Sequence, residues 1–282
     1  MAEGVELALG AMLFYGLADW VYKLAAAGGV QAHHFLALQA FFYAPAILLY
    51  GLATGTLAMG APFAWGMTAG ALVFVALYNF ARSLASGAVS IVAPVFRLSF
   101  AITAALAVWL LDEPLTHWKL AGLAASLAAV WLLLAGGPAA APRASTSSVS
   151  RVLVATVAMG LVSLIYKFGT NAGGSPATIL SGQASVFLPL ATLFALARDR
   201  GFHPPRGAWR HAATAAVLLL CGFIMLLAGL ARGEASVLVP VAQLSFVVTA
   251  GLGFVFLRET LTLRKACGFA VAIAALLCLA RS

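Results

Sequence analysis

Three charged residues of this sequence lie inside apolar stretches, where an isolated charge is costly. Asp19 and Lys23 stand four residues apart in "GLADWVYKLAAAG", so on a helix they share one face and can neutralise each other. Arg97 lies in the middle of another apolar stretch, and its guanidinium can bind a carboxylate or phosphate through two parallel hydrogen bonds. Charged side chains in such positions face a bundle interior or water rather than lipid. They indicate either a binding site for an acidic solute or internal ion pairs, with Arg97–Asp19 one candidate pair.

A second group of polar residues occurs at related positions along the chain. Lys167 follows a tyrosine in "GLVSLIYKFGTNAG", as Lys23 does, but no acid precedes it by four residues. Its expected partner is Asp19 or a substrate carboxylate, unless it snorkels to the interface. Gln39 and Gln183 are predicted to form a helix–helix hydrogen bond or to line a polar cavity. The other polar candidates for a binding site are Tyr22, Tyr166, Asn79, Gln243, Ser99 and Ser245.

Two prolines interrupt long apolar stretches. Pro94 and Pro240 each remove a backbone hydrogen bond in mid-helix, so each is predicted to kink its helix, either as a structural feature or as a hinge for alternating access. The repeated acids Glu113 and Glu259 precede new helices beginning near a threonine. We expect these acids to take part in helix capping and turn closure, because a carboxylate suits the positive end of a helix.

The composition identifies the environment that these residues need. The chain has 282 residues, of which 63% are hydrophobic and 9% are charged, with a mean hydropathy of +1.05. Soluble domains carry about a quarter charged residues, so this is an integral membrane protein. The net charge of +8 is not gathered into a dense basic run, which argues against a nucleic-acid partner.

Sequence signatures of cofactor, metal or ATP chemistry are missing. The three cysteines lie in apolar stretches without the spacing of zinc ligands or of a disulfide framework. The chain contains no GxxxxGK[ST] loop, no HExxH and no GxSxG. We therefore expect no cofactor, no metal and no enzymatic activity.

Ten apolar segments have the length of a membrane-spanning helix, about 20 residues. They are residues 5–26, 32–52, 62–83, 88–110, 117–135, 151–170, 176–197, 209–230, 235–257 and 263–280. The predicted fold class is an all-α membrane protein with ten transmembrane helices.

The two halves of the chain repeat each other. "GAVSIVAPVFRLSFAITAAL" at 87–106 aligns with "GEASVLVPVAQLSFVVTAGL" at 233–252. We therefore expect a first five-helix repeat at 1–135, a linker at 136–150 and a second five-helix repeat at 151–282. Because five is an odd number of crossings, the second copy enters the membrane from the opposite side. Inverted repeats are typical of secondary transporters, with the substrate near the midplane at the repeat interface.

The sequence resembles the drug/metabolite transporter superfamily, in particular EamA-type ten-helix transporters. The resemblance rests on a lysine late in the first helix of each repeat, on the proline of the fourth helix, and on "E-x-x-T-x-x-K-x-x-G" at 113–122 and 259–268. It implies two EamA-like repeats around a central cavity formed chiefly by the first four helices of each half. Members often have an arginine in the second helix where this chain has Gln39 and Gln183.

These observations predict a secondary transporter that moves a small polar metabolite, an amino acid or carboxylate, by alternating access. The resemblance implies export. Alternatives are a multidrug efflux carrier and, with less support, a membrane-embedded lipid enzyme. The expected partners are the solute, the lipid bilayer, and a coupling proton or an exchanged solute, with the chain a monomer or homodimer. The expected location is the inner (plasma) membrane. The distribution of loop arginines and lysines places the termini outside, whereas the resemblance places them in the cytoplasm.

Overall fold

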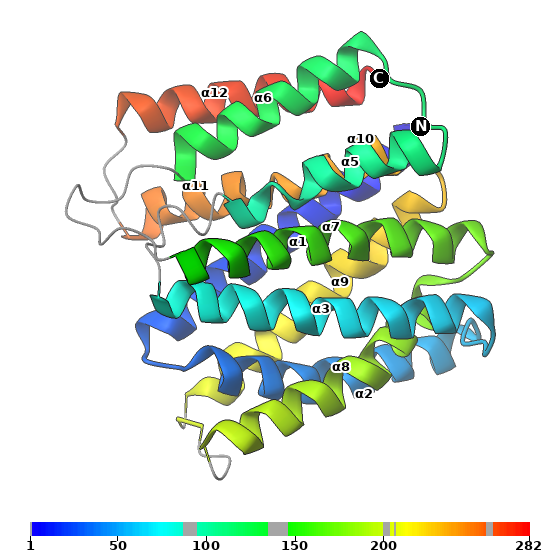
Figure 1. The fold of residues 1–282 in the computed structure, drawn as a ribbon, viewed down its shortest axis with the longest axis vertical. Helices are drawn as coiled ribbons and strands as arrows, with labels where there is room; N and C mark the ends of the chain where they lie inside the picture. Colours follow the sequence, from blue (N-terminus) through cyan, green and yellow to red (C-terminus); the bar gives the residue numbers. More distant parts are fainter. Residues whose placement is uncertain (1, 87–94, 135–145, 200–203, 206, 258–261) are drawn as a thin grey trace.

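A computed structural model of the chain describes all residues except 1, 87–94, 135–145, 200–203, 206 and 258–261. The described residues form α-helices joined by short connections, without a β-strand (Figure 1). The helices are α1 (Ala2–Ala27), α2 (Ala32–Thr54), α3 (Ala61–Ser86), α5 (Ser99–Leu110), α6 (His117–Leu134), α7 (Thr146–Asn171), α8 (Pro176–Asp199), α9 (Ala208–Leu230), α10 (Ala235–Gln243), α11 (Ser245–Leu257) and α12 (Leu263–Ala280).

The lengths and apolar character of these helices fit the ten predicted spans. Eight helical segments in the described part of the chain are long and apolar enough to cross a membrane, with α10 and α11 together forming one of them. Val95–Leu110 and His117–Leu133 are shorter apolar helices at the positions of the predicted fourth and fifth spans. The all-α membrane fold is therefore confirmed. Helix α7 begins at Thr146, within the predicted linker, whose first part lies outside the described residues.

The fourth and ninth spans are each interrupted in the described part of the chain, at Leu98 and at Leu244. In the ninth span α10 ends at Gln243 and α11 starts at Ser245, one turn after Pro240. The amide of Leu244 donates to the carbonyls of Pro240 and Val241, at 3.1 and 3.2 Å, which tightens the backbone at the break. A helical turn at 95–97 likewise ends at Leu98, before α5. Pro94 lies outside the described residues.

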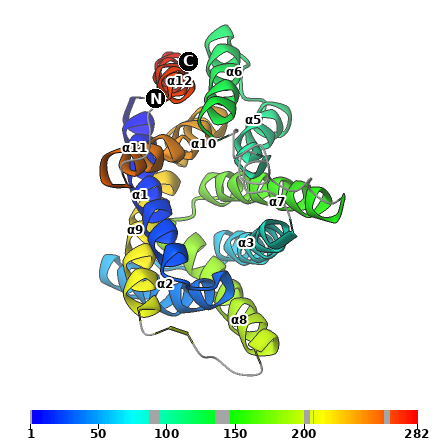
Figure 2. The same cartoon turned by 90° about the vertical axis from the view of Figure 1, so that its left-hand side faces the viewer.

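The helices of the two halves interleave, and their contacts follow a two-fold pattern. Helix α1 packs extensively against α9, and its counterpart α7 packs against α3. Likewise α1 contacts α11 while α7 contacts α5, and α6 packs against its own counterpart α12. Figure 2 looks along the helices and shows α6 and α12 together at one end of the bundle, beyond α5 and α10. The fifth helix of each half therefore lies outside the group formed by the other helices.

The same two-fold relation appears in individual hydrogen bonds. Thr249 Oγ1 of α11 donates to the Gly16 carbonyl of α1 at 2.9 Å. Its counterpart Thr103 Oγ1 of α5 donates to the Gly160 carbonyl of α7, also at 2.9 Å. A Cβ atom at Gly16 would lie 2.8 Å from the Ser245 carbonyl oxygen, and one at Gly160 would lie 3.0 Å from that of Ser99. The glycines thus permit a close helix approach in both halves.

The repeated acid Glu113 caps a helix, as predicted, but that helix is not the one that follows it in the chain. Its carboxylate accepts hydrogen bonds from the amides of Ala235 and Ser236, both at 2.8 Å. It therefore caps α10 in the other half of the chain, because the fold brings the end of the fourth span beside the start of the ninth. Thr116 accepts from its own helix, from the Lys119 amide at 3.1 Å, as predicted. Glu259 lies outside the described residues.

Candidate functional site

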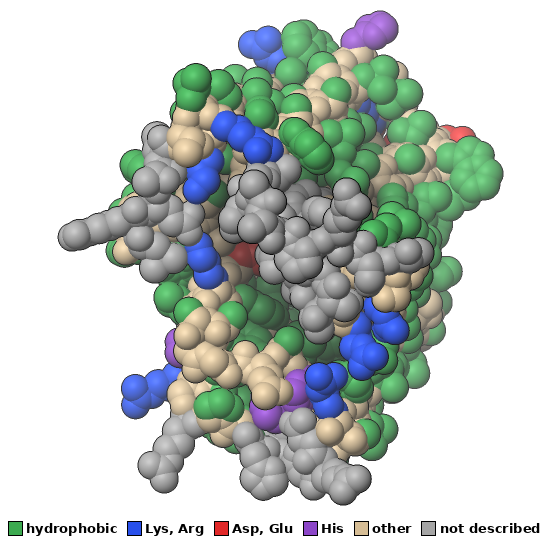
Figure 3. All heavy atoms as spheres, turned by 60° about the vertical axis from the view of Figure 1, so that its left-hand side comes forward, with side chains coloured by type: hydrophobic (Ala, Val, Ile, Leu, Met, Phe, Trp, Pro, Cys, Tyr) green, Lys and Arg blue, Asp and Glu red, His purple; other side chains and the backbone are tan. Residues whose placement is uncertain are grey.

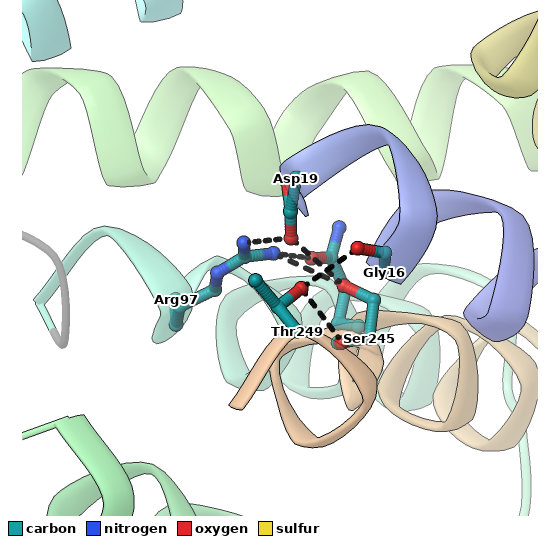
Figure 4. A network of polar contacts seen from close by, with 6 residues as sticks. Gly16, Asp19, Arg97, Ser245 and Thr249 are labelled. Atoms are coloured by element: carbon teal, nitrogen blue, oxygen red, sulfur yellow. Dashed lines mark hydrogen bonds and ion pairs between the residues drawn. The ribbon is translucent and has the colours of Figure 1, made fainter. Parts of the chain in front are cut away.

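Asp19 and Arg97 form an ion pair between the first and fourth spans (Figure 4). Asp19 lies on α1, eight residues before the helix ends at Ala27, which is about 12 Å along the axis. The distance from Arg97 Nη2 to Asp19 Oδ2 is 2.5 Å, a close contact between opposite charges that makes this a charge-assisted hydrogen bond. The candidate pair that the sequence indicates as one alternative is therefore present in the structure.

The second terminal nitrogen of Arg97 is held more weakly. Nη1 lies 3.4 Å from Gln243 Oε1 and 3.4 Å from Ser245 Oγ. Ser245 Oγ lies 3.4 Å from Asp19 Oδ2 as well. These distances exceed the usual range of a protein hydrogen bond. Arg97 Nη1 can therefore exchange these contacts for an acidic ligand while Nη2 stays on Asp19.

The helix breaks position this polar group. Arg97 precedes the break at Leu98, and Gln243 and Ser245 flank the break at Leu244. The two helix breaks therefore lie beside each other, and the polar residues next to them meet there. Gly16, one turn before Asp19, lets α11 approach α1 closely, and the bond from Thr249 fixes that contact (Figure 4).

The ion pair is not sealed in dry packing. The exposed fraction of the side chain is 22% for Arg97 and 32% for Asp19, although both belong to apolar spans. Figure 3 shows a hollow in the face formed by the helix ends, with lysine and arginine side chains around it and an acidic group in its depth. Part of each charged side chain is therefore accessible from outside the protein.

Two tyrosine–glutamine pairs brace the first two helices of each half. The Tyr22 hydroxyl donates to Gln39 Oε1, and the Tyr166 hydroxyl donates to Gln183 Oε1. All four side chains are predicted from the sequence as candidates for the binding site. Their hydrogen bonds join α1 to α2 and α7 to α8, which is the predicted helix–helix contact. Tyr166 is 1% exposed, so in this state it contacts protein rather than solute.

The remaining candidates lie apart from the ion pair. Lys167 does not reach Asp19; its Nζ donates to the carbonyls of Leu230 and Gly233, both at 2.7 Å. These carbonyls are at the C-terminal end of α9, which attracts a positive charge. Asn79 donates to the Val75 carbonyl of its own helix at 2.8 Å. Lys23 Nζ lies over the Trp20 ring, 5.9 Å from its centroid.

Two residues of this region are not among the candidates predicted from the sequence, although their recurrence in both repeats marks them. Thr249 and Gly16 recur as Thr103 and Gly160 in the same register of the repeat, and this recurrence could have identified them. The described part of the chain contains no group of three or more His, Cys, Asp or Glu side chains arranged to hold a metal ion. The site is thus composed of one ion pair and neutral hydrogen-bonding groups.

Comparisons with known proteins give a family and a fold. Residues 146–281 match the EamA-like transporter family. An uncharacterized protein of Methanocaldococcus jannaschii is 35% identical over 72 residues, which cover 26% of this chain and 53% of that protein, so the match spans about half of its length. One solved crystal structure aligns with 98% of this chain and 95% of its own chain, at a TM-score of 0.84 and 17% identity. That likeness concerns the fold alone and extends over both halves.

Proposed function

Because residues 146–281 belong to the EamA-like transporter family and the chain is a multi-pass membrane protein, we propose that it is a secondary transporter of small carboxylate-bearing metabolites. The family makes it a membrane transporter of the drug/metabolite type. The proposed substrate is an amino acid, the direction is export, and the mechanism is alternating access between the two repeats. The site of transport is the plasma membrane.

The observation that supports a carboxylate substrate is that the two terminal nitrogens of Arg97 are bound at different distances. Nη2 is bound to Asp19 at 2.5 Å, whereas Nη1 has contacts of only 3.4 Å. A substrate carboxylate can replace the weak contacts and gain a charge-assisted hydrogen bond. Gln243 and Ser245, which Nη1 now contacts, would then be released to bind the same ligand.

The acid of the pair explains the preference for an amino acid. The hydrogen bonds of Asp19 to Arg97 and Ser245 both fall on Oδ2, so Oδ1 is the oxygen that would receive the ammonium group of a substrate. A zwitterion would therefore place its carboxylate on Arg97 and its ammonium on Asp19. Binding both groups together neutralises the charges that the site removes from water.

The pair also offers a route to coupling. When an amino acid binds, its carboxylate replaces Gln243 and Ser245 on Arg97 Nη1, so the loaded and empty carriers differ in the link between the fourth and ninth spans. Such a differential contact is what a ligand needs in order to shift a conformational equilibrium. Exchange of one solute for another fits this scheme, because the incoming solute supplies the same carboxylate and ammonium groups that the departing one takes away.

Flux into proteoliposomes tests the proposal. Purified protein is reconstituted, and the uptake of labelled amino acids and organic acids is measured in exchange for the unlabelled solute. We expect saturable uptake of at least one amino acid, and we expect Arg97→Gln to reduce it by about tenfold or more, as for loss of a charged hydrogen bond. Arg210→Gln, an exposed arginine on α9, is the control and should transport normally. Uptake that is unchanged in Arg97→Gln would refute the assignment of the site.

A further inference from the structure

A separate cavity opens at the end of the bundle where α3 and α8 finish and α2 begins. It has a volume of about 250 Å³, and its lining comes from these three helices and from Gln31, which caps α2. None of them contributes Asp19, Arg97, Gln243 or Ser245. The cavity is thus formed by elements other than those of the proposed transport site.

The inner part of this cavity is aromatic. Phe194 of α8 makes edge-to-face contacts with Tyr78 and Phe74 of α3, with ring centroids 5.0 and 6.1 Å apart. Phe187 of α8 also lines the cavity and is 9% exposed. Edge-to-face pairs hold rings in fixed orientations. The walls therefore form a preshaped apolar surface.

The outer part of the cavity is basic. Arg82 and Arg198 both line it and lie near the ends of α3 and α8. Arg82 follows Phe74 by eight residues and Arg198 follows Phe187 by eleven, which places the arginines about 12 and 16 Å further along their helices. His33, at the start of α2, lines the cavity as well. The cavity thus changes from apolar to cationic along its depth.

Neither arginine of this cavity recurs at the matching position of the other repeat. At the repeat offsets found in the sequence, Arg82 corresponds to Ala228 and Arg198 corresponds to Thr54. Residues that stabilise the shared fold recur in both halves, as the tyrosine–glutamine pairs do. Arginines that only orient a protein in the membrane need no particular surroundings, so orientation does not explain why these two line an aromatic cavity. Two arginines that have no counterpart in the other repeat, and that lie beyond aromatic walls, point to a ligand.

We propose that this cavity binds amphipathic anions, molecules with one acidic head group and an apolar body. The head group lies between Arg82 and Arg198, and the body lies against Phe74, Tyr78 and Phe194. The volume of about 250 Å³ is near the lower end of small-molecule sites, about 300–1,000 Å³, so the enclosed body is one ring or a short alkyl segment. A dissolved aromatic acid and the end of an anionic lipid both present this chemistry.

The first experiment measures binding of labelled indole-3-acetate to protein in nanodiscs of neutral phosphatidylcholine. All variants carry Arg97→Gln, so that the proposed transport site does not contribute. We expect Arg82→Gln with Arg198→Gln to weaken binding by about tenfold or more. The matched control is Arg151→Gln with Arg210→Gln, which removes the same charge outside the cavity. Leu36→Trp narrows the cavity from α2 while keeping both arginines, and it should weaken binding as well.

The second experiment distinguishes the source of the ligand. Protein is reconstituted with phosphatidylglycerol, and the lipid retained after release from the disc is measured by native mass spectrometry. If retention of phosphatidylglycerol falls in the Arg82/Arg198 variant, the occupant is a lipid. If binding of indole-3-acetate falls, the occupant is a dissolved acid. Either result supports the proposal that the cavity binds amphipathic anions. Binding and retention that change no more than in the Arg151/Arg210 control would overturn the proposal. Gel filtration and thermal unfolding establish that each variant is folded, and Leu36→Trp provides the test if the double variant is not.

Discussion

The Asp19–Arg97 pair places opposite charges inside a protein that is otherwise poor in charge. Removing either partner from such a pair is more costly than removing both, because the remaining charge is left without compensation. The exposed fractions of 22% and 32% mean that water screens part of this cost. The same partial exposure gives a dissolved anion access to the arginine.

Asp19→Asn tests this balance. The substitution leaves Arg97 without its anion, and we expect it to lower the free energy of unfolding by about 1–3 kcal/mol, less than for a fully buried pair. A dissolved carboxylate can then take the place of Asp19. Acetate should therefore raise the melting temperature of the Asp19→Asn protein more than that of the wild type, measured in detergent against chloride at equal ionic strength.

The double variant Asp19→Asn, Arg97→Gln is the control for this experiment. It lacks both charges, so it should be more stable than Asp19→Asn alone and should show no specific response to acetate. An effect of acetate on Asp19→Asn no larger than its effect on the double variant would contradict an anion-accessible arginine at this position.

Sequence reasoning locates several of these residues but not their partners. Asp19 and Arg97 stand out because charge is rare in apolar spans, and Gln243 because it replaces the arginine in the other repeat. Lys167 is expected from the sequence to join the same group, yet it binds the carbonyls at the end of α9. Which of several polar groups a long side chain reaches depends on how distant helices pack, and periodicity within one segment does not contain that information.

The contact between α1 and α11 depends on the absence of a side chain at Gly16. A Cβ atom there would lie 2.4 Å from Val248 Cβ and 2.8 Å from the Ser245 carbonyl oxygen, and neither atom can move without shifting α11. We expect Gly16→Ala to reduce the free energy of unfolding by about 1–3 kcal/mol, the usual cost of overpacking. Thermal unfolding of the purified protein measures the change.

Gly251→Ala is the matched control, since this position is on α11 and a Cβ atom added there would meet no other atom within 4 Å. It should leave stability unchanged or raise it slightly, because alanine favours the helix more than glycine does. If Gly16→Ala were as stable as Gly251→Ala, the close approach of α11 to α1 would be wrong.

Glu113 is a second element-level contact between the halves. Glu113→Ala removes the acceptor of the Ala235 and Ser236 amides, both buried, so α10 loses its cap at a cost of about 1–3 kcal/mol. We expect faster hydrogen exchange at the start of α10, measured by mass spectrometry of peptides covering residues 233–243. Asp112→Asn removes the neighbouring charge and should leave exchange unchanged. Equal exchange in both variants would exclude the capping role.

The helices themselves are largely predictable from the sequence, whereas the exact place of an interruption and the helix that a repeated acid caps are not. Apolar segments of about 20 residues indicate the position of each span, because a bilayer imposes that length on any helix that crosses it. The break at Leu244 falls one turn after the proline that suggests it, and the Glu113 cap belongs to a helix more than a hundred residues away. Both depend on the packing of one half against the other.

At the level of the whole molecule, the halves share one interior. Because α1 packs against α9 and α7 packs against α3, each half covers the first helix of the other. A motion of one repeat therefore changes contacts in both. This arrangement fits transport through rocking of the repeats around the level of the Asp19–Arg97 pair, where the helix breaks of both halves meet.

The charge distribution of the molecule predicts its orientation in the membrane. Arg82, Arg151, Arg198 and Arg210 all lie at the end where α3, α8 and the start of α9 meet, and basic residues near span ends favour the cytoplasm. In a cysteine-free background, Gly207→Cys reports on this end and Met59→Cys on the opposite one, where Met59 is 81% exposed. An impermeant maleimide applied to intact cells should label Met59→Cys and should label Gly207→Cys only after permeabilisation. The reverse pattern would put the termini in the cytoplasm and make the opening beside Arg82 an extracellular one.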